Sequence, residues 1–337
     1  MTSLPPPVGR SLDVVCIGMA IVDVLTHTDD AFLDHHAMVK GAMDLIDTER
    51  ALRIYDAMPP AIEISGGSAA NTAVGVASFG RRAAFIGKVA DDDLGAVFAH
   101  DIRAAGVAYA TDAVTGAAAA AGTARCLILV TPDAQRTMNT HLGVAASLQA
   151  SDVDADLIAS ASVLYIEGYL WDDPGAIGVI RTAIDTARAA GTRVAFSLSD
   201  GFCVDRHRQE FLRLVAADVD ILFANEVEIC SLYETSEFAS AAAQVSDHVA
   251  IACLTRSEQG SVVVAGGERI VVPAVPAELV DTTGAGDLYA AGFLSGWSSG
   301  LSIEDAARMG SLAAGEVISH LGARPQSPLS DLWRVHR

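Results

Sequence analysis

The sequence predicts an α/β fold with a mostly parallel central sheet and helices on both of its faces. From Asp152 onward, buried strands alternate with helical segments: a strand at 163–168, a helix at 174–190 and a strand at 193–198. This alternation is typical of strands joined by crossover helices, which run parallel. The chain has 337 residues, of which 51% are hydrophobic, so it can bury a large core. We therefore expect a single α/β domain over residues 1–337.

The other elements of this fold follow from hydrophobic periodicity and from turn residues. The N-terminal half predicts strands at 14–18 and 83–88, and helices from Gly67 to about 79 and from Asp93 to 105. The C-terminal half predicts further helices and strands, namely helices at 208–217 and 237–244, strands at 219–224 and 249–255, and a hairpin of 261–266 and 269–273.

Two stretches depart from this alternation and predict a small second sheet. Residues 26–65 mix polar and apolar side chains around a short helical piece at 48–57, and strands are expected at 123–131 and 136–142. We expect the segments 26–65 and 110–142 to form together a β-sheet lid.

Composition excludes several classes of protein. The net charge is −20, whereas nucleic-acid binding requires a basic face. No uninterrupted apolar run reaches the length of a membrane span. The five cysteines form no CxxC pair, which favours buried thiols in a reducing cytoplasm over disulfides or metal ligands.

The segment 280–288 predicts an anion site that contains an unexpected acid. Gly284 and Gly286 precede a helix, because Tyr289, Phe293 and Trp297 recur at helical spacing. Unpaired N–H groups and the helix dipole favour a phosphate at such a terminus. Asp287 would repel that phosphate unless it accepts a proton from the attacking group. The alternative is that Asp287 is only a favourable acid in a first helical turn. The segment matches neither the sequence pattern of a Walker A loop nor that of a dinucleotide-binding fingerprint.

A second glycine turn, Gly66 to Asn71, also precedes a helix. An asparagine inside a helix is a poor helix former, so Asn71 would more naturally contact a ligand that carries hydroxyl groups. A tight turn before a packed alanine-rich helix is the alternative. Asp23, Asn225, Thr255 and Asp287 all follow predicted strands, so we expect them to share the carboxyl edge of the sheet.

These stretches, in this order, resemble the ribokinase-like (PfkB) carbohydrate and nucleoside kinases over residues 14–325. The segment 281–287 is similar to the DTxGAGD signature of that family, the segment 66–71 to its GGxxxN motif, and the segment 225–228 to its NxxE motif. The resemblance implies a three-layer ribokinase-like fold with a β-sheet lid.

Within the family, the chain is most similar to the adenosine kinase branch. The likeness includes Phe32-Leu33-Asp34, the segments 165–169, 196–199 and 219–223, and Gly322-Ala323-Arg324-Pro325. Met19 stands where many adenosine kinases have asparagine, and Glu167 is more similar to the sugar kinases. A kinase of ribose, fructose, inosine or guanosine is therefore the alternative, and a non-catalytic ligand-binding member is the alternative from another class.

The resemblance implies an ATP-dependent phosphotransferase that acts on a hydroxymethyl group, with adenosine converted to AMP. Asp287 would be the general base, and Gly284, Ala285, Gly286 and Asp287 would form the anion hole. The resemblance places further residues on the substrate side: Asp23, Gly66, Gly67, Ser68, Asn71, Arg136, Glu167 and Tyr169. Tyr169 is otherwise explained by core packing.

The resemblance also implies a nucleotide side. The residues expected there are Asn225, Glu228, Thr255, Arg256, Gly260, Gly284, Gly286 and Ser311. Glu228 would bind Mg²⁺ through water. Asp281 and Thr283 would be the place for a monovalent cation such as K⁺. The expected partner is a small nucleoside or sugar, bound by a monomer or a homodimer.

Overall fold

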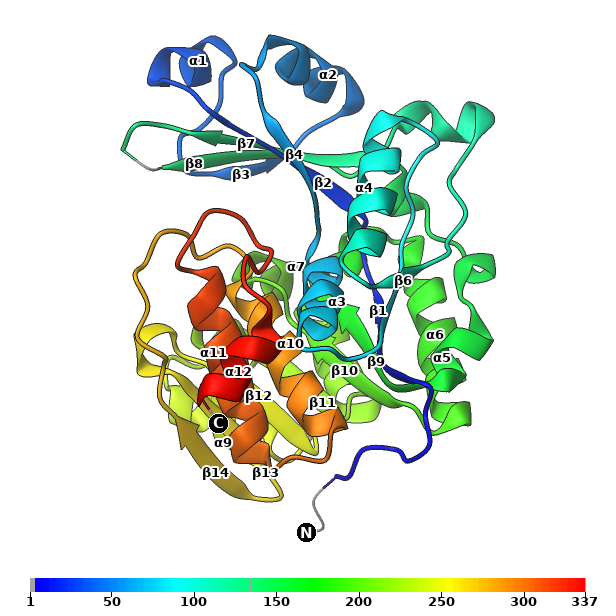
Figure 1. Cartoon of the computed structure of the whole chain (residues 1–337), viewed down its shortest axis with the longest axis vertical. Helices are drawn as coiled ribbons and strands as arrows, with labels where there is room; N and C mark the ends of the chain where they lie inside the picture. Colours follow the sequence, from blue (N-terminus) through cyan, green and yellow to red (C-terminus); the bar gives the residue numbers. More distant parts are fainter. Residues whose placement is uncertain (1–3, 134, 337) are drawn as a thin grey trace.

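The computed structural model describes residues 4–133 and 135–336 and contains two β-sheets (Figure 1). Over these residues the large sheet has the order β14-β13-β12-β11-β10-β9-β1-β5-β6. Its strands are β1 (Leu12–Ile17), β5 (Ala83–Ile86), β6 (Ala108–Tyr109), β9 (Ala161–Glu167), β10 (Arg193–Ser197), β11 (Ile221–Asn225), β12 (Ile251–Thr255), β13 (Ser261–Ala265) and β14 (Glu268–Val272). All its neighbouring strands pair in parallel except the β12-β13-β14 edge, which confirms the predicted sheet.

Helices cover both faces of the large sheet because alternate strand residues point to opposite sides. In β9, Val163 and Tyr165 belong to one core, whereas Leu164 and Ile166 belong to the other. The first core is covered by α3 (Ser68–Ser78), α4 (Asp93–Ala104), α10 (Ala285–Ser298), α11 (Ile303–Val317) and α12 (Leu329–His336). The second is covered by α5 (Ala155–Ser160), α6 (Ala176–Ala190), α7 (Gly201–Ala217), α8 (Glu226–Leu232) and α9 (Phe238–Val245). The three-layer architecture is therefore confirmed.

The small sheet has the order β3-β8-β7-β2-β4 and lies above the large sheet in Figure 1. Its strands are β2 (Ile21–His27), β3 (Met43–Leu45), β4 (Ile62–Gly66), β7 (Ala124–Val130) and β8 (Arg136–His141). Helices α1 (Asp30–His35) and α2 (Thr48–Ala57) cover the face that is turned away from the large sheet. We call this second unit the lid.

The lid begins earlier and its second segment begins later than the sequence indicated. After β1 the chain needs only the residues Gly18–Ala20 to enter β2, so Asp23 lies inside a lid strand rather than at the carboxyl end of a central strand. The second segment was expected from residue 110, but its first lid strand, β7, begins at Ala124. Asp287 also does not follow a strand directly, because a long loop joins β14 to α10.

Two helices that border the site were not predicted, and each has a local explanation. In α8, Asn225 and Glu228 cap each other across the first turn. In α11, the backbone N–H of Asp305 donates to the Ser302 hydroxyl at 3.0 Å. A third helix, α7, starts at Gly201 rather than near residue 208, and its backbone leaves helical geometry at His207.

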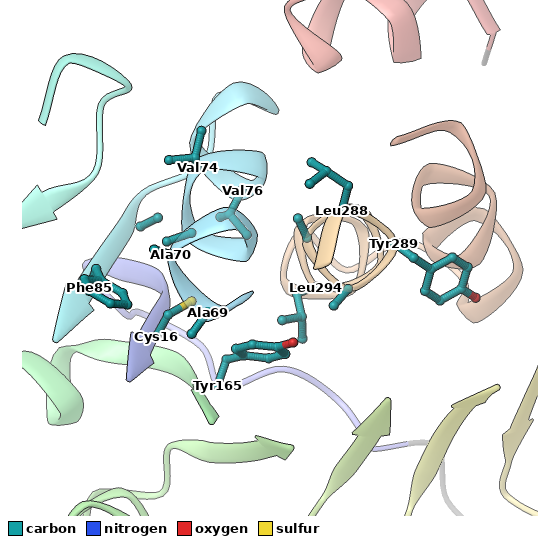
Figure 2. Close-up of a cluster of buried hydrophobic side chains, with 14 of the residues drawn as sticks. Cys16, Ala69, Ala70, Val74, Val76, Phe85, Tyr165, Leu288, Tyr289 and Leu294 are labelled. Atoms are coloured by element: carbon teal, nitrogen blue, oxygen red, sulfur yellow. The ribbon is translucent and has the colours of Figure 1, made fainter. Parts of the chain in front are cut away.

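Close packing of α3 against α10 joins the two segments that carry the glycine turns. Figure 2 shows these helices side by side, with buried apolar side chains of both, among them Ala69, Val76, Leu288 and Leu294. A Cβ atom on Gly75 of α3 would lie only 2.6 Å from the Cβ of Ala291 on α10. On its other side, a Cβ on Gly292 would lie 2.4 Å from the carbonyl oxygen of Met309 in α11. Small residues on both sides thus set the position of α10.

Two further features agree with the composition. All five cysteines are free thiols, and four of them are buried. Across residues 4–133 and 135–336, no helix has both the length and the apolar composition needed to span a bilayer.

The contact between α3 and α10 predicts opposite effects for two glycine-to-alanine changes. Gly75→Ala should lower the free energy of unfolding by about 1–3 kcal/mol, because the added methyl group overpacks the interface. Gly178→Ala, in α6, is the matched control: its Cβ meets nothing within 4 Å, so helix propensity alone should raise stability by about 0.5–1 kcal/mol. Denaturant titrations measure both values. Equal or greater stability of Gly75→Ala would show that the helices do not meet so closely.

Candidate active site

The two glycine turns meet at the carboxylate of Asp287, in the first turn of α10. The Ser68 hydroxyl donates to Oδ1 of Asp287 at 2.6 Å, and the Asn71 amide donates to Oδ2 at 2.9 Å. The Thr72 hydroxyl donates to the backbone carbonyl of Asp287 at 3.2 Å. Ser68 and Asp287 are 219 positions apart in the chain, so only the fold brings them together. The predicted proximity of the turns is therefore observed, and it gives Asn71 a polar partner.

The start of α10 presents backbone donors toward the same place. Within the described residues, no acceptor lies in hydrogen-bond range of the N–H groups of Gly286 and Asp287. The N–H of Ala285 instead donates to the carbonyl of Thr282 at 3.2 Å, so it is not a free donor of the predicted anion hole. Gly284 has φ 79° and lies against Ala323, where a Cβ atom would come within 2.7 Å. Two amides and the helix dipole can therefore bind an anion here.

The ionisation of Asp287 is set by competing surroundings. Burial raises its pKa, while the hydrogen bonds from Ser68 and Asn71 and the charge of Arg324 act in the opposite direction. The net pKa is raised, which makes the carboxylate a better proton acceptor than an ordinary aspartate.

Asp23 lies directly against the other glycine turn. A Cβ atom on Gly66 would come within 2.3 Å of Oδ2 of Asp23. Gly67 has φ 94°, and a Cβ there would come within 2.3 Å of the carbonyl oxygen of Met19. Burial raises the pKa of Asp23 to about 7, against the lowering effect of Arg324. Both glycines are thus required by space, and Asp23 is held beside them.

Glu167 and Met19 do not lie as the resemblance implied. Oε1 of Glu167 accepts the Met19 N–H at 2.7 Å and Oε2 accepts the Ala69 N–H at 2.6 Å. Glu167 is only 1% exposed, so its carboxylate binds the backbone at Met19 and Ala69 rather than a substrate. The Met19 side chain is 2% exposed and packs in the second core, so its thioether faces away from the site. Tyr169 borders the same core, and burial beside Asp200 raises the pKa of its hydroxyl well above the ordinary value.

Arg136 of the lid reaches the loop that precedes α10. Its Nη1 donates to Oδ1 of Asp281 and to the Thr283 hydroxyl, the latter at 2.8 Å. The Asp281 carboxylate also accepts the N–H groups of Thr283 at 2.9 Å and of Gly322 at 2.8 Å. A guanidinium would repel a second cation at the same two side chains. The predicted K⁺ site therefore does not fit this arrangement, because Arg136 already supplies the positive charge.

The predicted NxxE motif is a capping box in the structure. The side-chain oxygen Oδ1 of Asn225 accepts the backbone N–H of Glu228 at 2.9 Å, and the Glu228 carboxylate accepts the backbone N–H of Asn225 at 2.9 Å. This spacing is a known helix-start pattern, so the sequence carried the signal. Burial raises the pKa of Glu228 to about 7, with further raising by the charges of Asp200 and Asp287. Acidic groups that raise one another's pKa values fit a divalent cation, which would relieve their repulsion.

The remaining nucleotide-side residues have mainly structural contacts. Arg256 forms a two-point ion pair with Glu226, both bonds at 3.0 Å, and lies 4.2 Å over the ring of Phe238. Its charge is therefore largely neutralised by Glu226, so Arg256 has little charge to offer a nucleotide. Gly260 has φ 81°, and a Cβ there would meet the carbonyl oxygen of Val272 at 2.1 Å.

Two other predicted nucleotide-side residues lie on elements around the site. Thr255 ends β12 beside Asn225, at the carboxyl edge of the sheet as expected. Ser311 is 6% exposed within α11.

A second cluster of polar side chains lies outside this site. The ligand atoms of Asp172, Cys203 and His207 lie within 4.8 Å of one another, as metal ligands would. Arg206 donates to both oxygens of Asp172, at 2.9 and 2.7 Å. The carboxylate already has a cation, so the cluster is explained as the contact that holds the distorted start of α7.

Comparisons with known proteins agree with the fold and with the kind of site. The model of the pfkB family of carbohydrate kinases matches residues 49–329. A solved adenosine kinase from Sinorhizobium meliloti is 51% identical, with a TM-score of 0.90, over 97% of this chain and 99% of that one. A solved probable sugar kinase from Rhizobium etli CFN 42 is 48% identical, with a TM-score of 0.91 and the same coverage. A 5-dehydro-2-deoxygluconokinase from Geobacillus thermodenitrificans is 28% identical over 79% of this chain and 82% of that protein. The chain therefore belongs to the pfkB family of carbohydrate kinases.

Proposed function

We propose that this kinase transfers the terminal phosphoryl group of ATP to the 5′-hydroxyl of adenosine. The observation that carries the proposal is the position of Asp287. Its carboxylate lies where the anion-binding start of α10 meets the turn that carries Ser68 and Asn71. A base between a phosphoryl site and a hydroxyl site is the arrangement that phosphoryl transfer to an alcohol needs.

In this proposal each group at the junction has a separate task. Asp287 accepts the proton of the attacking hydroxyl while Ser68 and Asn71 hold the carboxylate in place. The N–H groups of Gly286 and Asp287 stabilise charge on the transferring phosphoryl group. When bound near Glu228, Mg²⁺ would neutralise phosphate charge. Asn225 and Thr255 then border the nucleotide from the carboxyl edge of the sheet.

The ribose diol is assigned to Asp23. Its carboxylate lies against Gly66, and an ionised carboxylate accepts two vicinal hydroxyl donors. Asp23 contacts the turn at Gly66, whereas Asp287 contacts it at Ser68 and Asn71, so a ribose bound at this turn would present its two ends to different acids.

The inner face of the lid favours a nucleoside over a free sugar. Strand alternation puts an apolar set on the face opposite α1 and α2: Ile21, Leu25, Ile64, Cys126, Ile128 and Met138. Ile64 is 40% exposed and pairs with Asp23. Cys126 and Ile128 are already buried, so the part of this face left in water lies around Ile64, and a flat aromatic base would cover it whereas a free sugar would not. Closure of the lid would also exclude water as a competing acceptor.

The runner-up is a sugar kinase, and specific observations favour it. The apolar Met19 side chain takes no part in the site, and curated relatives carry the name 5-dehydro-2-deoxygluconokinase. The high identity to a solved adenosine kinase supports the first proposal, although a solved probable sugar kinase is nearly as similar. A non-catalytic ligand-binding role is disfavoured because the Asp287 carboxylate and the N–H groups of Gly286 and Asp287, which lack an acceptor within the described residues, are all present.

A substrate panel separates these proposals. Purified protein with ATP and Mg²⁺ is assayed against adenosine, inosine, guanosine, ribose, fructose and 5-dehydro-2-deoxygluconate, with product detected by chromatography. Adenosine should give AMP with a higher kcat/KM than any free sugar, because only a nucleoside covers the lid face. A higher kcat/KM for inosine or guanosine than for adenosine would move the assignment to that nucleoside. A higher kcat/KM for a free sugar would reject the adenosine assignment and leave the kinase chemistry intact.

Asp287→Ala tests the proposed base. It should lower kcat by a factor on the order of 10² to 10⁴, the usual contribution of general base catalysis. Adenosine binding, measured by calorimetry, should change little, because Asp23 and the Gly66–Asn71 turn remain. Asp185→Ala, at an exposed position of α6, is the control and should behave as wild type. Turnover of Asp287→Ala at the wild-type rate would remove Asp287 from the mechanism.

Ile64→Ser tests the lid face. Loss of apolar contact with the base should raise KM for adenosine about 5- to 30-fold, equivalent to burying one aliphatic side chain less well. Val271→Ser, at a 69% exposed position of β14, is the matched control and should leave KM unchanged. An unchanged KM in Ile64→Ser would mean that the substrate does not reach this face.

A further inference from the structure

The segment Gly322–Arg324, which follows α11, contacts both glycine turns of the site. The Gly322 N–H donates to the Asp281 carboxylate at 2.8 Å. Ala323 lies against Gly284, where it leaves no room for a Cβ atom. Arg324 then extends to the other turn. Three consecutive residues thus touch the loop that begins the anion site and the turn that faces it.

All three guanidinium nitrogens of Arg324 donate hydrogen bonds to residues that flank the Gly66–Gly67 turn. Nε donates to the Ser65 carbonyl at 2.9 Å, Nη2 to the Ser65 hydroxyl at 3.2 Å, and Nη1 to the Ala70 carbonyl at 2.9 Å. Ser65 precedes the two glycines and Ala70 follows them. Glycines have no side chains that could hold a turn, so its shape depends on contacts of this kind.

The same guanidinium is the cation that acts on Asp23 and Asp287, whereas the Arg136 guanidinium is paired with Asp281. Arg324 favours the charged forms of both Asp23 and Asp287, and so opposes the burial that raises their pKa values. Asp101 of α4 also faces the guanidinium, and its carboxylate accepts the Ser65 N–H at 3.1 Å. On the Asp287 side, the neighbouring titratable groups are Cys16, Tyr165, Glu167, Tyr169 and Glu228. None of these is cationic.

We propose that Arg324 is a positioning residue of the phosphoryl-transfer site, which fixes the Gly66–Gly67 turn relative to the start of α10 through its hydrogen bonds to Ser65 and Ala70. The inference rests on the proposed kinase function of that site. In this proposal, the Gly322–Arg324 segment sets the distance between the hydroxyl-binding turn and the anion-binding turn. A bidentate planar group suits this task, since a lysine offers one point charge instead of a fork.

Arg324→Met and Arg324→Lys test the proposal against wild type and against Arg334→Met, a control at a 76% exposed side chain of α12. Arg324→Met should lower kcat by a factor on the order of 10², as misplacement of reacting groups by about 1 Å does. KM should change much less. The acidic limb of its pH–rate profile should move to higher pH, because Asp287 loses the charge that favours its ionised form.

Arg324→Lys separates position from charge. It should keep the acidic limb near that of wild type, because the charge remains, while kcat stays reduced, because the fork of hydrogen bonds is lost. Wild-type kcat in both variants would overturn the proposal. So would equal losses of kcat and thermal stability that Arg324→Lys fully restores, since that result would indicate a general structural role.

A measurement without turnover distinguishes failure of this inference from failure of the proposed function. Carbon-detected NMR titration, with the Asp287 signal assigned by its absence in Asp287→Asn, should show a higher pKa for Asp287 in Arg324→Met than in wild type. An unchanged Asp287 titration would overturn the inference even in an active kinase. A wild-type protein that phosphorylates nothing in the substrate panel but shows the expected titration would overturn the proposed function instead.

Discussion

The contact of α3 with α10 is the constraint on which the site depends. Each helix begins at a glycine turn, and the two turns face each other only because small residues let the helices approach closely. Gly75 of α3 against Ala291 of α10 leaves no space for a larger side chain, and on the other side of α10 Gly292 lies equally close to Met309 of α11. This packing brings Ser68 and Asn71 to hydrogen-bond distance of Asp287. The chemistry thus depends on packing that is itself apolar.

The site concentrates acids and supplies few compensating cations. Burial raises the pKa values of Asp23, Glu167 and Glu228 to about 7. It also raises the pKa of Asp287 above its ordinary value. Hydrogen bonds from two backbone amides stabilise the Glu167 carboxylate against burial, and the capping box does the same for Glu228. Backbone amides, together with a bound divalent cation, are therefore the groups that would receive an anionic nucleotide.

Much of the fold and of the centre of the site could be predicted from the sequence. Hydrophobic periodicity indicated the parallel sheet, and the glycine turns indicated Asp287, Ser68 and Asn71, because turns and helix starts are local features. Glu167, Arg256 and Arg324 could not be placed in the same way. Their roles depend on which distant groups pair with them, and a charged residue in a sequence does not reveal its partner. The sequence therefore could not show that Glu226 neutralises the charge of Arg256.

The boundaries of the lid were also hard to predict from the sequence. Its strands were predicted, but the point where the chain passes from one sheet to the other was placed too late, because β1 and β2 are separated by only Gly18–Ala20. Asp23 was consequently assigned to the wrong sheet, although it still reaches the site. Proximity in a fold can thus be predicted for the wrong topological reason.

The most direct test of the central claim is a crystal structure with bound adenosine. The account predicts that the 5′-oxygen lies within about 3 Å of the Asp287 carboxylate, at the distance a general base requires. The ribose diol should lie at Asp23 and the base against the inner face of the lid. Adenosine bound with its 5′-oxygen directed away from Asp287, or bound outside the Gly66–Asn71 turn, would contradict the account.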